Sequence, residues 1–327
     1  MAVIAAGAWG TALSVALAGK HQVTLWTREP EVIKNMQETR ENRRFLPGVL
    51  LPESLQIEAD LNTATLGADL LIIATPLIGL RTTLCQLREA GRSCPLVWVC
   101  KGFEPGSGKL PHQVVDEELG GIVPYGVLTG PSFAEEVAQG LPTALALASR
   151  DASFARRIAT GLHRRRLRIY AHEDLVGAEI GGAVKNVMAI AAGVCDGLKF
   201  GYNARAALLT RGLTEISRLG VALGGQPGTF MGLAGMGDLI LTCTGDLSRN
   251  RRVGLALAEG KSLPQILEDL GHVAEGVSTA REVTRLSEQM GIEMPITHAV
   301  NAILHEGEPA HEAVEKLLSR DSKVEFL

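Results

Sequence analysis

Met-Ala-Val-Ile-Ala-Ala-Gly-Ala-Trp-Gly, residues 1–10, is the stretch that decides the fold of this 327-residue chain. A short apolar strand leads into a glycine-containing turn, and a helical pattern follows over Thr11–Gly19. At such a junction a helix N-terminus can face a pyrophosphate. Gly7 lets the backbone approach the phosphates, Gly10 lets the helix pack on the strand, and Ala5 stands where a first glycine is usual. The stretch therefore predicts a dinucleotide-binding turn.

The first half of the chain alternates apolar runs with helical patterns. Strands are predicted at Met1–Ala5, Gln22–Trp26, Leu70–Ala74, Leu96–Cys100, Gly126–Leu128 and Thr143–Ala148. Helices are predicted between them at Thr11–Gly19, Glu29–Glu38, Ile78–Ala90, Leu110–Leu119 and Ala152–His163. This alternation predicts an α/β domain with a mostly parallel sheet and helices on both faces. The stretch Asn42–Pro52, which contains Pro47-Gly48, is predicted to be an irregular loop.

From about Asp174 onward only helical periods continue. They are predicted for a long helix through residues 180–198 and for Ala204–Leu219, Arg252–Glu259, Pro264–Leu270, Thr279–Gly291 and His298–Glu306. The most apolar run, Val184–Leu198, is too short to span a bilayer. We therefore expect a Rossmann-like, mostly parallel sheet domain over residues 1–172 and an all-helical substrate and catalytic domain over residues 173–327.

Composition narrows the class of protein. Apolar residues make up 46% and charged residues 21%, which is typical of a globular protein, and the net charge of −4 argues against a general binder of nucleic acid or anionic membranes. Five cysteines and eight histidines are dispersed without ligand spacing, so no metal site is expected. The N-terminus lacks the pattern of a signal peptide. These features predict a cytoplasmic protein with reduced thiols.

The turn after the second predicted strand bears on the choice of cofactor. An NAD enzyme places an acidic residue there, on the ribose, but this chain has Thr27-Arg28. Arg28 can pair with a 2′-phosphate, which favours NADP(H) over NAD(H). Alternatively, Arg28 is a surface residue without a ligand and Glu29 meets a ribose.

Two segments follow predicted strands at the carboxyl edge of the sheet, where open α/β sheets bind ligands. Lys101 follows the strand Leu96–Cys100, and Thr129-Gly130-Pro131-Ser132 follows a later strand. Both segments could be ordinary turns. Of the two, the lysine directly after a buried strand is the less expected in an ordinary turn.

Lys185 lies inside the predicted long helix. Gly182, Ala189 and Ala192 share its face, so the neighbouring side chains are small. A lysine confined there loses solvation, its pKa falls, and it can donate or accept a proton. The alternative is a lysine that extends to solvent from an otherwise buried helix.

The segment 235–252 carries polar residues at helical spacing. Asp238 and Thr242 are four residues apart, so a helix would place both on one face. After a glycine-containing break, the next helix is predicted to open with three polar residues: Ser248 as its cap, then Arg249 and Asn250.

A helix N-terminus that carries an arginine can hold an anion, because free backbone N–H groups and a full charge meet there. The alternative is a polar turn between two helices. Arg251 and Arg252 are expected to form a solvated basic face.

Together these motifs make the chain resemble the NAD(P)-dependent glycerol-3-phosphate dehydrogenases of bacterial type from end to end. Eight motifs in order carry the resemblance: residues 7–13, 25–28, 101–103, 129–134, 179–186, 235–242, 247–252 and 274–276. Each motif alone is weak evidence for the family, but eight motifs in order and at fitting intervals are specific to it. The resemblance implies a Rossmann-like domain followed by a helical domain.

The resemblance also implies roles for individual residues. The catalytic residues would be Lys185 as the acid and base, with Lys101 and Asp238. The dinucleotide would contact Gly7, Ala8, Trp9, Gly10, Arg28, Lys101, Ala134, Arg249 and Glu275. The substrate would contact Lys101, Gly130, Ser132, Lys185, Asn186, Asp238, Thr242, Ser248, Arg249 and Asn250. Ala5 is the one clear departure from the family pattern.

The implied reaction is the reversible NAD(P)H-dependent reduction of dihydroxyacetone phosphate to sn-glycerol 3-phosphate, a precursor of phospholipids. NADP(H) would be preferred, NAD(H) possible, and no metal required. Two alternatives remain: a 3-hydroxyacid or sugar-acid dehydrogenase of the same architecture, or a non-catalytic dinucleotide sensor in which Ala5 marks a decayed site. We expect a small-molecule substrate, no nucleic-acid or membrane partner, and a homodimer.

Overall fold

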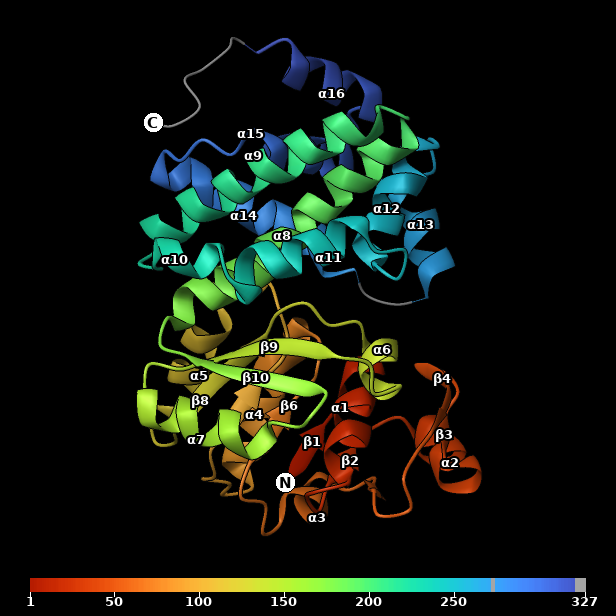
Figure 1. Cartoon of the computed structure of the whole chain (residues 1–327), viewed down its shortest axis with the longest axis vertical. Helices are drawn as coiled ribbons and strands as arrows, with labels where there is room; N and C mark the ends of the chain where they lie inside the picture. Colours follow the sequence, from red (N-terminus) through yellow and green to blue (C-terminus); the bar gives the residue numbers. More distant parts are fainter. Residues whose placement is uncertain (272–273, 321–327) are drawn as a thin grey trace.

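The computed structural model describes residues 1–271 and 274–320, and over them a sheet domain is joined to a group of helices (Figure 1). The strands are β1 (Ala2–Ile4), β2 (Thr24–Trp26), β3 (Glu41–Asn42), β4 (Leu46–Leu50), β5 (Gln56–Glu58), β6 (Leu71–Ile73), β7 (Leu96–Trp98), β8 (Tyr125–Thr129), β9 (Thr143–Ala148) and β10 (Leu167–His172). In these residues an eight-stranded sheet has the order β10-β9-β8-β7-β6-β1-β2-β5. Only β8 and β9 pair antiparallel within it, so the predicted mostly parallel sheet is confirmed.

Helices cover both faces of this sheet. They are α1 (Ala8–Ala18), α2 (Pro30–Thr39), α3 (Leu61–Thr65), a 3₁₀ turn (Leu77–Gly79), α4 (Leu80–Glu89), α5 (Pro111–Leu119), α6 (Ala134–Ala138) and α7 (Ala152–Leu162). Successive strand residues point to opposite faces, so Val3 packs with α1, α2 and α7 while Ile4 packs with α4 and α5. Both faces are therefore apolar, as a parallel sheet between two helical layers requires.

The second half is helical throughout its described residues, as predicted. Its elements are α8 (Leu175–Gly197), α9 (Gly201–Ala222), α10 (Pro227–Phe230), a π-helical turn (Leu233–Gly237), α11 (Asp238–Thr244), α12 (Arg249–Ala258), α13 (Leu263–Leu270), α14 (Glu275–Met290), α15 (Pro295–Asn301), a second π-helical turn (Ala302–Glu306) and α16 (Ala310–Leu318). Helix α8 lies at the centre and packs against α9, α11, α12 and α14. Asp174 caps its start by accepting a hydrogen bond from the Gly177 amide at 2.8 Å.

Helix α8 is longer than the apolar run expected from the sequence. With 23 residues it is long and apolar enough to cross a membrane by length and composition, so the prediction that it is too short was wrong. However, 94% of its most apolar window is buried within the protein, which is how the core helix of a folded domain is placed.

The region 42–52 corrects a second expectation. It was predicted to be an irregular loop, but β3 and β4 pair antiparallel, and Leu46 is fully buried against Ala12 of α1 and Val137 of α6. Pro47 and Gly48 suggested a loop because they disfavour regular strands, whereas burial of Leu46 and Val49 on other helices stabilises the pairing. The sequence also missed two strands at the sheet margins, β5 and β10.

Candidate active site

Two lysines meet one carboxylate where the helical domain contacts the sheet. Asp238, at the start of α11, accepts a hydrogen bond from Lys101 Nζ at Oδ2 (2.6 Å) and another from Lys185 Nζ at Oδ1. Lys185 also donates to Thr242 Oγ1 at 2.8 Å, and that hydroxyl donates to the Asp238 carbonyl at 2.6 Å. The structure thus brings together four residues that were predicted to share a site.

The lysine and the carboxylate are both buried. Lys185 is 6% exposed and Asp238 1% exposed. Burial lowers the pKa of Lys185 to about 8; Asp238 opposes this shift and the Lys101 ammonium adds to it. For Asp238, burial alone would raise the pKa, but the two ammonium groups outweigh it and hold the pKa below its usual value. At neutral pH the cluster therefore carries two positive charges and one negative charge.

Close packing between α8 and the sheet edge brings Lys101 to this cluster. A Cβ on Gly182 would lie 2.9 Å from Thr129 Oγ1, which is too close, and in ordinary contact at 3.5 Å with Cδ of Lys101, so the glycine lets the end of β8 approach α8 beside the lysine. The Thr129 hydroxyl is buried and has no hydrogen-bond partner among the described residues. The sequence placed Thr129 in a segment at the carboxyl edge of the sheet, but the prediction gave this residue no role of its own.

The amides of Asn186 and Asn250 connect three helices beside the lysines. Asn250 donates to Asn186 Oδ1 at 3.0 Å and accepts from the Gly276 amide at 3.0 Å. Both side chains are buried, and together they join α8, α12 and the first turn of α14. The binding role predicted for them stays a prediction, but their location next to Lys185 agrees with it.

Helix α12 opens as predicted. The Ser248 side chain caps it by accepting a hydrogen bond from the Arg251 amide at 3.2 Å. Arg249 follows as an exposed side chain at the first helical position. There the free backbone N–H groups and the guanidinium charge favour the binding of an anion.

The expectation that Arg251 lies on a solvated face was wrong. Its side chain is 12% exposed and forms ion pairs with Asp196 at 2.7 Å and Asp246 at 2.9 Å. The partner Asp196 lies on α8, 55 positions away in the sequence, so this contact could not be inferred from local spacing. Arg252 is exposed, as expected.

Glu275, at the first residue of α14, lies within the electrostatic reach of the lysine cluster. Burial raises the pKa of its carboxyl, and Arg249, Lys101 and Lys185 each act to lower it. These couplings place two predicted cofactor ligands, Glu275 and Arg249, near the two lysines.

The turn after β1 has an unusual backbone. Ala5 has a φ of +89°, a conformation that favours glycine. A Cβ on Gly10 would collide with the Ala5 carbonyl oxygen, so helix α1 starts directly against the end of β1. Asn42, a buried residue missed from the sequence, donates to the Ala6 carbonyl and to Thr11 Oγ1, both at 2.8 Å. A side chain of the β3–β4 ribbon thus holds the turn in place.

The remaining predicted cofactor residues lie around this turn. Trp9 and Ala134 pack on the cluster that contains Leu46, between α1, α6 and β4. Arg28 is exposed after β2, while Glu29, the alternative ribose ligand, forms an ion pair with Arg44. This pairing leaves Arg28 as the more available of the two for a ligand.

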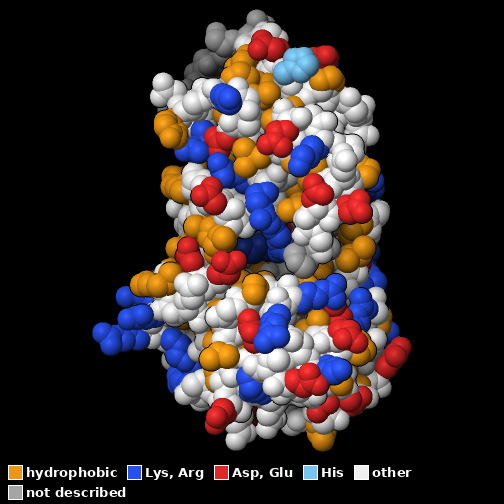
Figure 2. Space-filling view, turned by 90° about the vertical axis from the view of Figure 1, so that its right-hand side faces the viewer, with side chains coloured by type: hydrophobic (Ala, Val, Ile, Leu, Met, Phe, Trp, Pro, Cys, Tyr) orange, Lys and Arg blue, Asp and Glu red, His pale blue; other side chains and the backbone are white. Residues whose placement is uncertain are grey.

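The substrate residues predicted after β8 form a local turn. Ser132 Oγ donates to the Gly130 carbonyl at 3.0 Å, and Gly130 has a φ of +130°, which favours glycine. Figure 2 shows the molecule narrowing between the two domains, with lysine and arginine side chains gathered in the recess. This arrangement suits a ligand with several negative charges.

Comparisons with known proteins identify the family. The model described as NAD-dependent glycerol-3-phosphate dehydrogenase N-terminus matches residues 1–155, and the corresponding C-terminus model matches residues 174–315. The chain belongs to the NAD-dependent glycerol-3-phosphate dehydrogenase family.

Individual relatives match this family member over nearly their whole length. A glycerol-3-phosphate dehydrogenase [NAD(P)+] of Dechloromonas aromatica is 64% identical over 99% of this chain and 98% of the relative. One of Nitrosospira multiformis is 60% identical over 100% and 99%. The crystal structure of glycerol-3-phosphate dehydrogenase from Coxiella burnetii superposes with a TM-score of 0.93 at 43% identity, covering 98% of each chain. The Rossmann-like and helical fold is therefore shared.

The residues of this family member also fit a dinucleotide on structural grounds. In the described part of the chain no side chain caps the start of α1, so its first amide groups are free to bind a pyrophosphate. The unpartnered Thr129 hydroxyl offers a buried polar group beside Lys101. Among the described residues, no group of three or more His, Cys, Asp or Glu side chains could hold a metal ion.

Proposed function

We propose that this protein catalyses the reversible reduction of dihydroxyacetone phosphate to sn-glycerol 3-phosphate with NAD(P)H. The observation that carries the proposal is the pair of ammonium groups, from buried Lys185 and half-buried Lys101, on the single carboxylate of Asp238. The excess positive charge of these three side chains suits a carbonyl oxygen that becomes negative during reduction. The family membership and its full-length relatives support the same reaction.

When bound, the reduced nicotinamide would supply the hydride that the ketone carbon accepts. Lys185, with its pKa lowered to about 8, donates a proton to the developing alkoxide. Lys101 stabilises the negative charge while the proton moves, and Asp238 holds both ammonium groups by hydrogen bonds. In the reverse direction, neutral Lys185 accepts the proton from the substrate hydroxyl.

The substrate phosphate would bind at the start of α12. Arg249 supplies a charge there, Ser248 orients the first turn, and Asn250 lies on the neighbouring face toward Asn186. Binding energy from the phosphate would hold the ketone near the lysines, so phosphate contributes to the rate although it does not react.

NADP(H) is the proposed preferred cofactor, and NAD(H) a possible one. Arg28 is exposed where a 2′-phosphate would lie, and the nearby Glu29 is already paired with Arg44. An arginine binds a phosphate through several N–H groups at once.

One assay tests substrate and cofactor together. Purified protein should oxidise NADPH when dihydroxyacetone phosphate is added, with a higher kcat/KM for NADPH than for NADH. Dihydroxyacetone without the phosphate should be a far poorer substrate, because the α12 anion site would be empty. Equal turnover of both ketones would contradict the phosphate site. Cofactor binding without turnover of any small ketone would contradict the proposed activity.

The wider setting of the reaction is also a proposal. We infer that the protein acts in the cytoplasm, supplies glycerol phosphate for phospholipid synthesis and forms a homodimer through its helical domain. Large apolar side chains are exposed on that domain at Phe200 (39%), Tyr202 (81%) and Val221 (45%). Light scattering after size-exclusion chromatography would give the mass in solution, and a monomer at micromolar concentration would contradict the dimer.

A further inference from the structure

A segment of the sheet domain crosses to the helices. Residues 101–112, which we call the strap, begin at Lys101 and end in the first turn of α5. Phe103 and Leu110 of the strap are buried in the apolar cluster that contains Val184 of α8. The strap that carries Lys101 is therefore packed into the core of the helical domain.

Polar contacts hold the strap to the same domain. The Gly106 amide donates to Glu282 Oε1 on α14 at 2.8 Å, and the His112 amide donates to Glu179 Oε1 on α8 at 2.9 Å. The His112 ring also pairs with the Glu179 carboxylate. These contacts fix the strap relative to Asp238, while its two ends continue from β7 and into α5 of the sheet domain.

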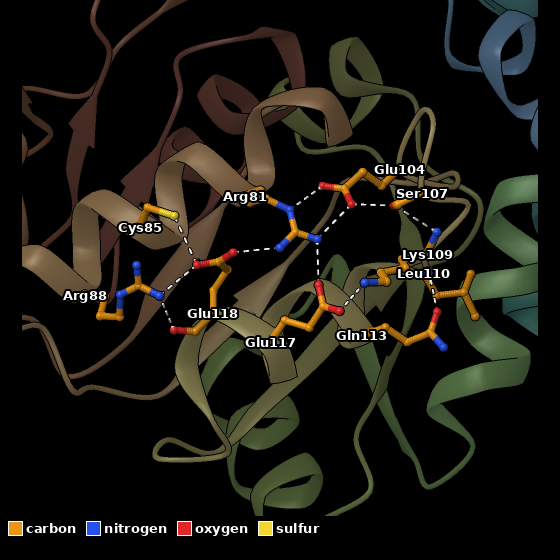
Figure 3. Close-up of polar contacts among 10 residues, drawn as sticks. All are labelled: Arg81, Cys85, Arg88, Glu104, Ser107, Lys109, Leu110, Gln113, Glu117 and Glu118. Carbon is orange, nitrogen blue, oxygen red and sulfur yellow. Dashed lines mark hydrogen bonds and ion pairs between the residues drawn. The ribbon is translucent and has the colours of Figure 1, made fainter.

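Arg81 supplies a connection back to the sheet domain. From α4 its Nε and Nη2 donate to the two carboxylate oxygens of Glu104 in the strap, each at 2.8 Å (Figure 3). The same guanidinium also reaches Glu117 at 2.8 Å and Glu118 at 2.6 Å on α5. Ser107 donates to the Glu104 carboxylate at 2.5 Å. Such bidentate pairs are geometrically specific.

We propose that Arg81 is a positioning residue for catalysis: its bidentate contact with Glu104 fixes the strap, so that the Lys101 ammonium is held between Asp238 and the cofactor edge of the sheet. The proposal rests on the proposed role of Lys101 in the active site. The proposal gives the charged cluster around Arg81, which lies outside the active site, a role in catalysis.

The geometry explains why this contact matters to Lys101. Only three positions separate Glu104 from Lys101, and Gly102 between them has a φ of +122°, so the segment follows a defined turn. The Lys101 side chain is 16% exposed and bridges the sheet edge to Asp238. Without Arg81 the middle of the strap would be held to the sheet domain only through its two chain ends, and the Lys101 ammonium would be held less tightly at its distance from a nicotinamide bound at the sheet.

Helix α4 offers a matched control. Arg88 lies on the same helix and in the same charged cluster, and it donates to Glu118 Oε2 at 2.8 Å and to the Glu118 carbonyl at 3.0 Å. It has no contact with the strap in the cluster drawn in Figure 3. Arg88→Met therefore removes an arginine of the cluster while the Arg81–Glu104 contact remains.

The first test does not depend on activity. The rate at which acetic anhydride acetylates Lys101 is followed by peptide mass spectrometry in the wild type, Arg81→Met and Arg88→Met. We expect faster acetylation of Lys101 in Arg81→Met only, because a loosened strap exposes the ammonium. Equal rates in all three proteins would overturn the proposal, whether or not the protein reduces dihydroxyacetone phosphate.

The second test is kinetic. Arg81→Met should lower kcat about tenfold or more, since small misplacements of a catalytic group have large effects on rate, while KM for NADPH changes little. The pKa of Lys185 should rise in this variant because the Lys101 ammonium, which lowers it, has moved away. The alkaline limb of the pH profile should therefore shift upward. A purely structural role would leave that limb in place.

Two further variants guard against misfolding. Glu104→Gln removes the same ion pair from the strap side and should reproduce the kinetic changes, and Arg81→Lys should restore part of kcat through a single contact. Loss of kcat in Arg88→Met equal to that in Arg81→Met would overturn the proposal, because it would trace the effect to the charged cluster as a whole.

Discussion

The two ends of the site are built differently. At the reactive end, Lys101, Lys185 and Asp238 come from segments up to 137 positions apart and meet through buried and half-buried side chains. At the proposed nucleotide end, ten contiguous residues form a strand, a turn and a helix start, and the backbone would supply the binding groups. The reactive end therefore depends on tertiary packing, whereas the nucleotide end depends mainly on local conformation.

Each end also carries a different cost to stability. Lowering the pKa of buried Lys185 from 10.5 to about 8 corresponds to about 3 kcal/mol against its charged form. At the other end, the positive φ of Ala5 strains the backbone instead. The reactive end carries an unfavourable buried charge, and the nucleotide end carries an unfavourable backbone conformation. Substitutions at the reactive end should therefore change activity most, whereas substitutions at the nucleotide end should change mainly stability.

Removing the proton donor should have the largest effect. Lys185→Met should lower kcat about 10³-fold, because the variant loses the buried ammonium whose pKa of about 8 suits proton transfer near neutral pH. Asp238 would keep its 2.6 Å contact with Lys101, so the buried carboxylate remains paired. Steady-state kinetics give kcat, and fluorescence titration with NADPH should show almost unchanged binding.

Thermal unfolding completes this prediction. Lys185→Met replaces a partly disfavoured buried charge by an apolar chain of similar length, so its melting temperature should equal or exceed that of the wild type. Normal turnover in this variant would show that another residue moves the proton. A large fall in melting temperature would show that Lys185 is chiefly structural.

The charge balance of the reactive end gives the next prediction. Reduction needs protonated Lys185, so its kcat should fall above pH about 8, and the reverse oxidation should rise up to the same pH. In Asp238→Asn the carboxylate that raises the pKa of Lys185 is lost, and the facing Lys101 lowers it further. The limbs of both pH profiles, for reduction and for oxidation, should therefore move to lower pH. At pH 7.5 the kcat for reduction should fall by up to about tenfold.

Rate profiles from pH 5.5 to 10 in both directions would measure this shift. The wild type serves as the reference, and Thr242→Val, which removes only a neutral partner of Lys185, should shift the limbs less. Limbs that stay in place in Asp238→Asn would show that a different group titrates.

The same contrast explains what could be predicted from the sequence. The turn after β1, the alternation of strands and helices, and the Ser248 cap are set by neighbouring residues, so local patterns were sufficient. By contrast, the fate of Arg251 depends on Asp196, and the β3–β4 ribbon depends on burial of Leu46 under two helices. Residue spacing could not bring Lys101, Lys185 and Asp238 together, and only the family resemblance joined them.

The smallest effect is expected at the nucleotide end. Ala5 has a φ of +89°, which costs an alanine about 1–2 kcal/mol, whereas glycine adopts it freely but loses about 0.5–1 kcal/mol more on folding. Ala5→Gly should therefore stabilise the protein by up to about 1 kcal/mol, a rise of about 2 °C in melting temperature. The dissociation constant for NADPH should stay the same or fall, since relieving the strain leaves the amides of α1 in place.

Ala6→Gly is the matched control for Ala5→Gly, because it makes the same chemical change one position along the turn. Ala6 is 2% exposed and packs in the apolar cluster on the α1 face of the sheet, and its φ is not positive. Glycine there gains no relief of strain and loses a buried methyl group, so the melting temperature should fall. Calorimetry of both variants separates the two effects. If Ala5→Gly also lowered the melting temperature, the turn would not be strained, and the contrast between the two ends would rest on the buried charge of Lys185 alone.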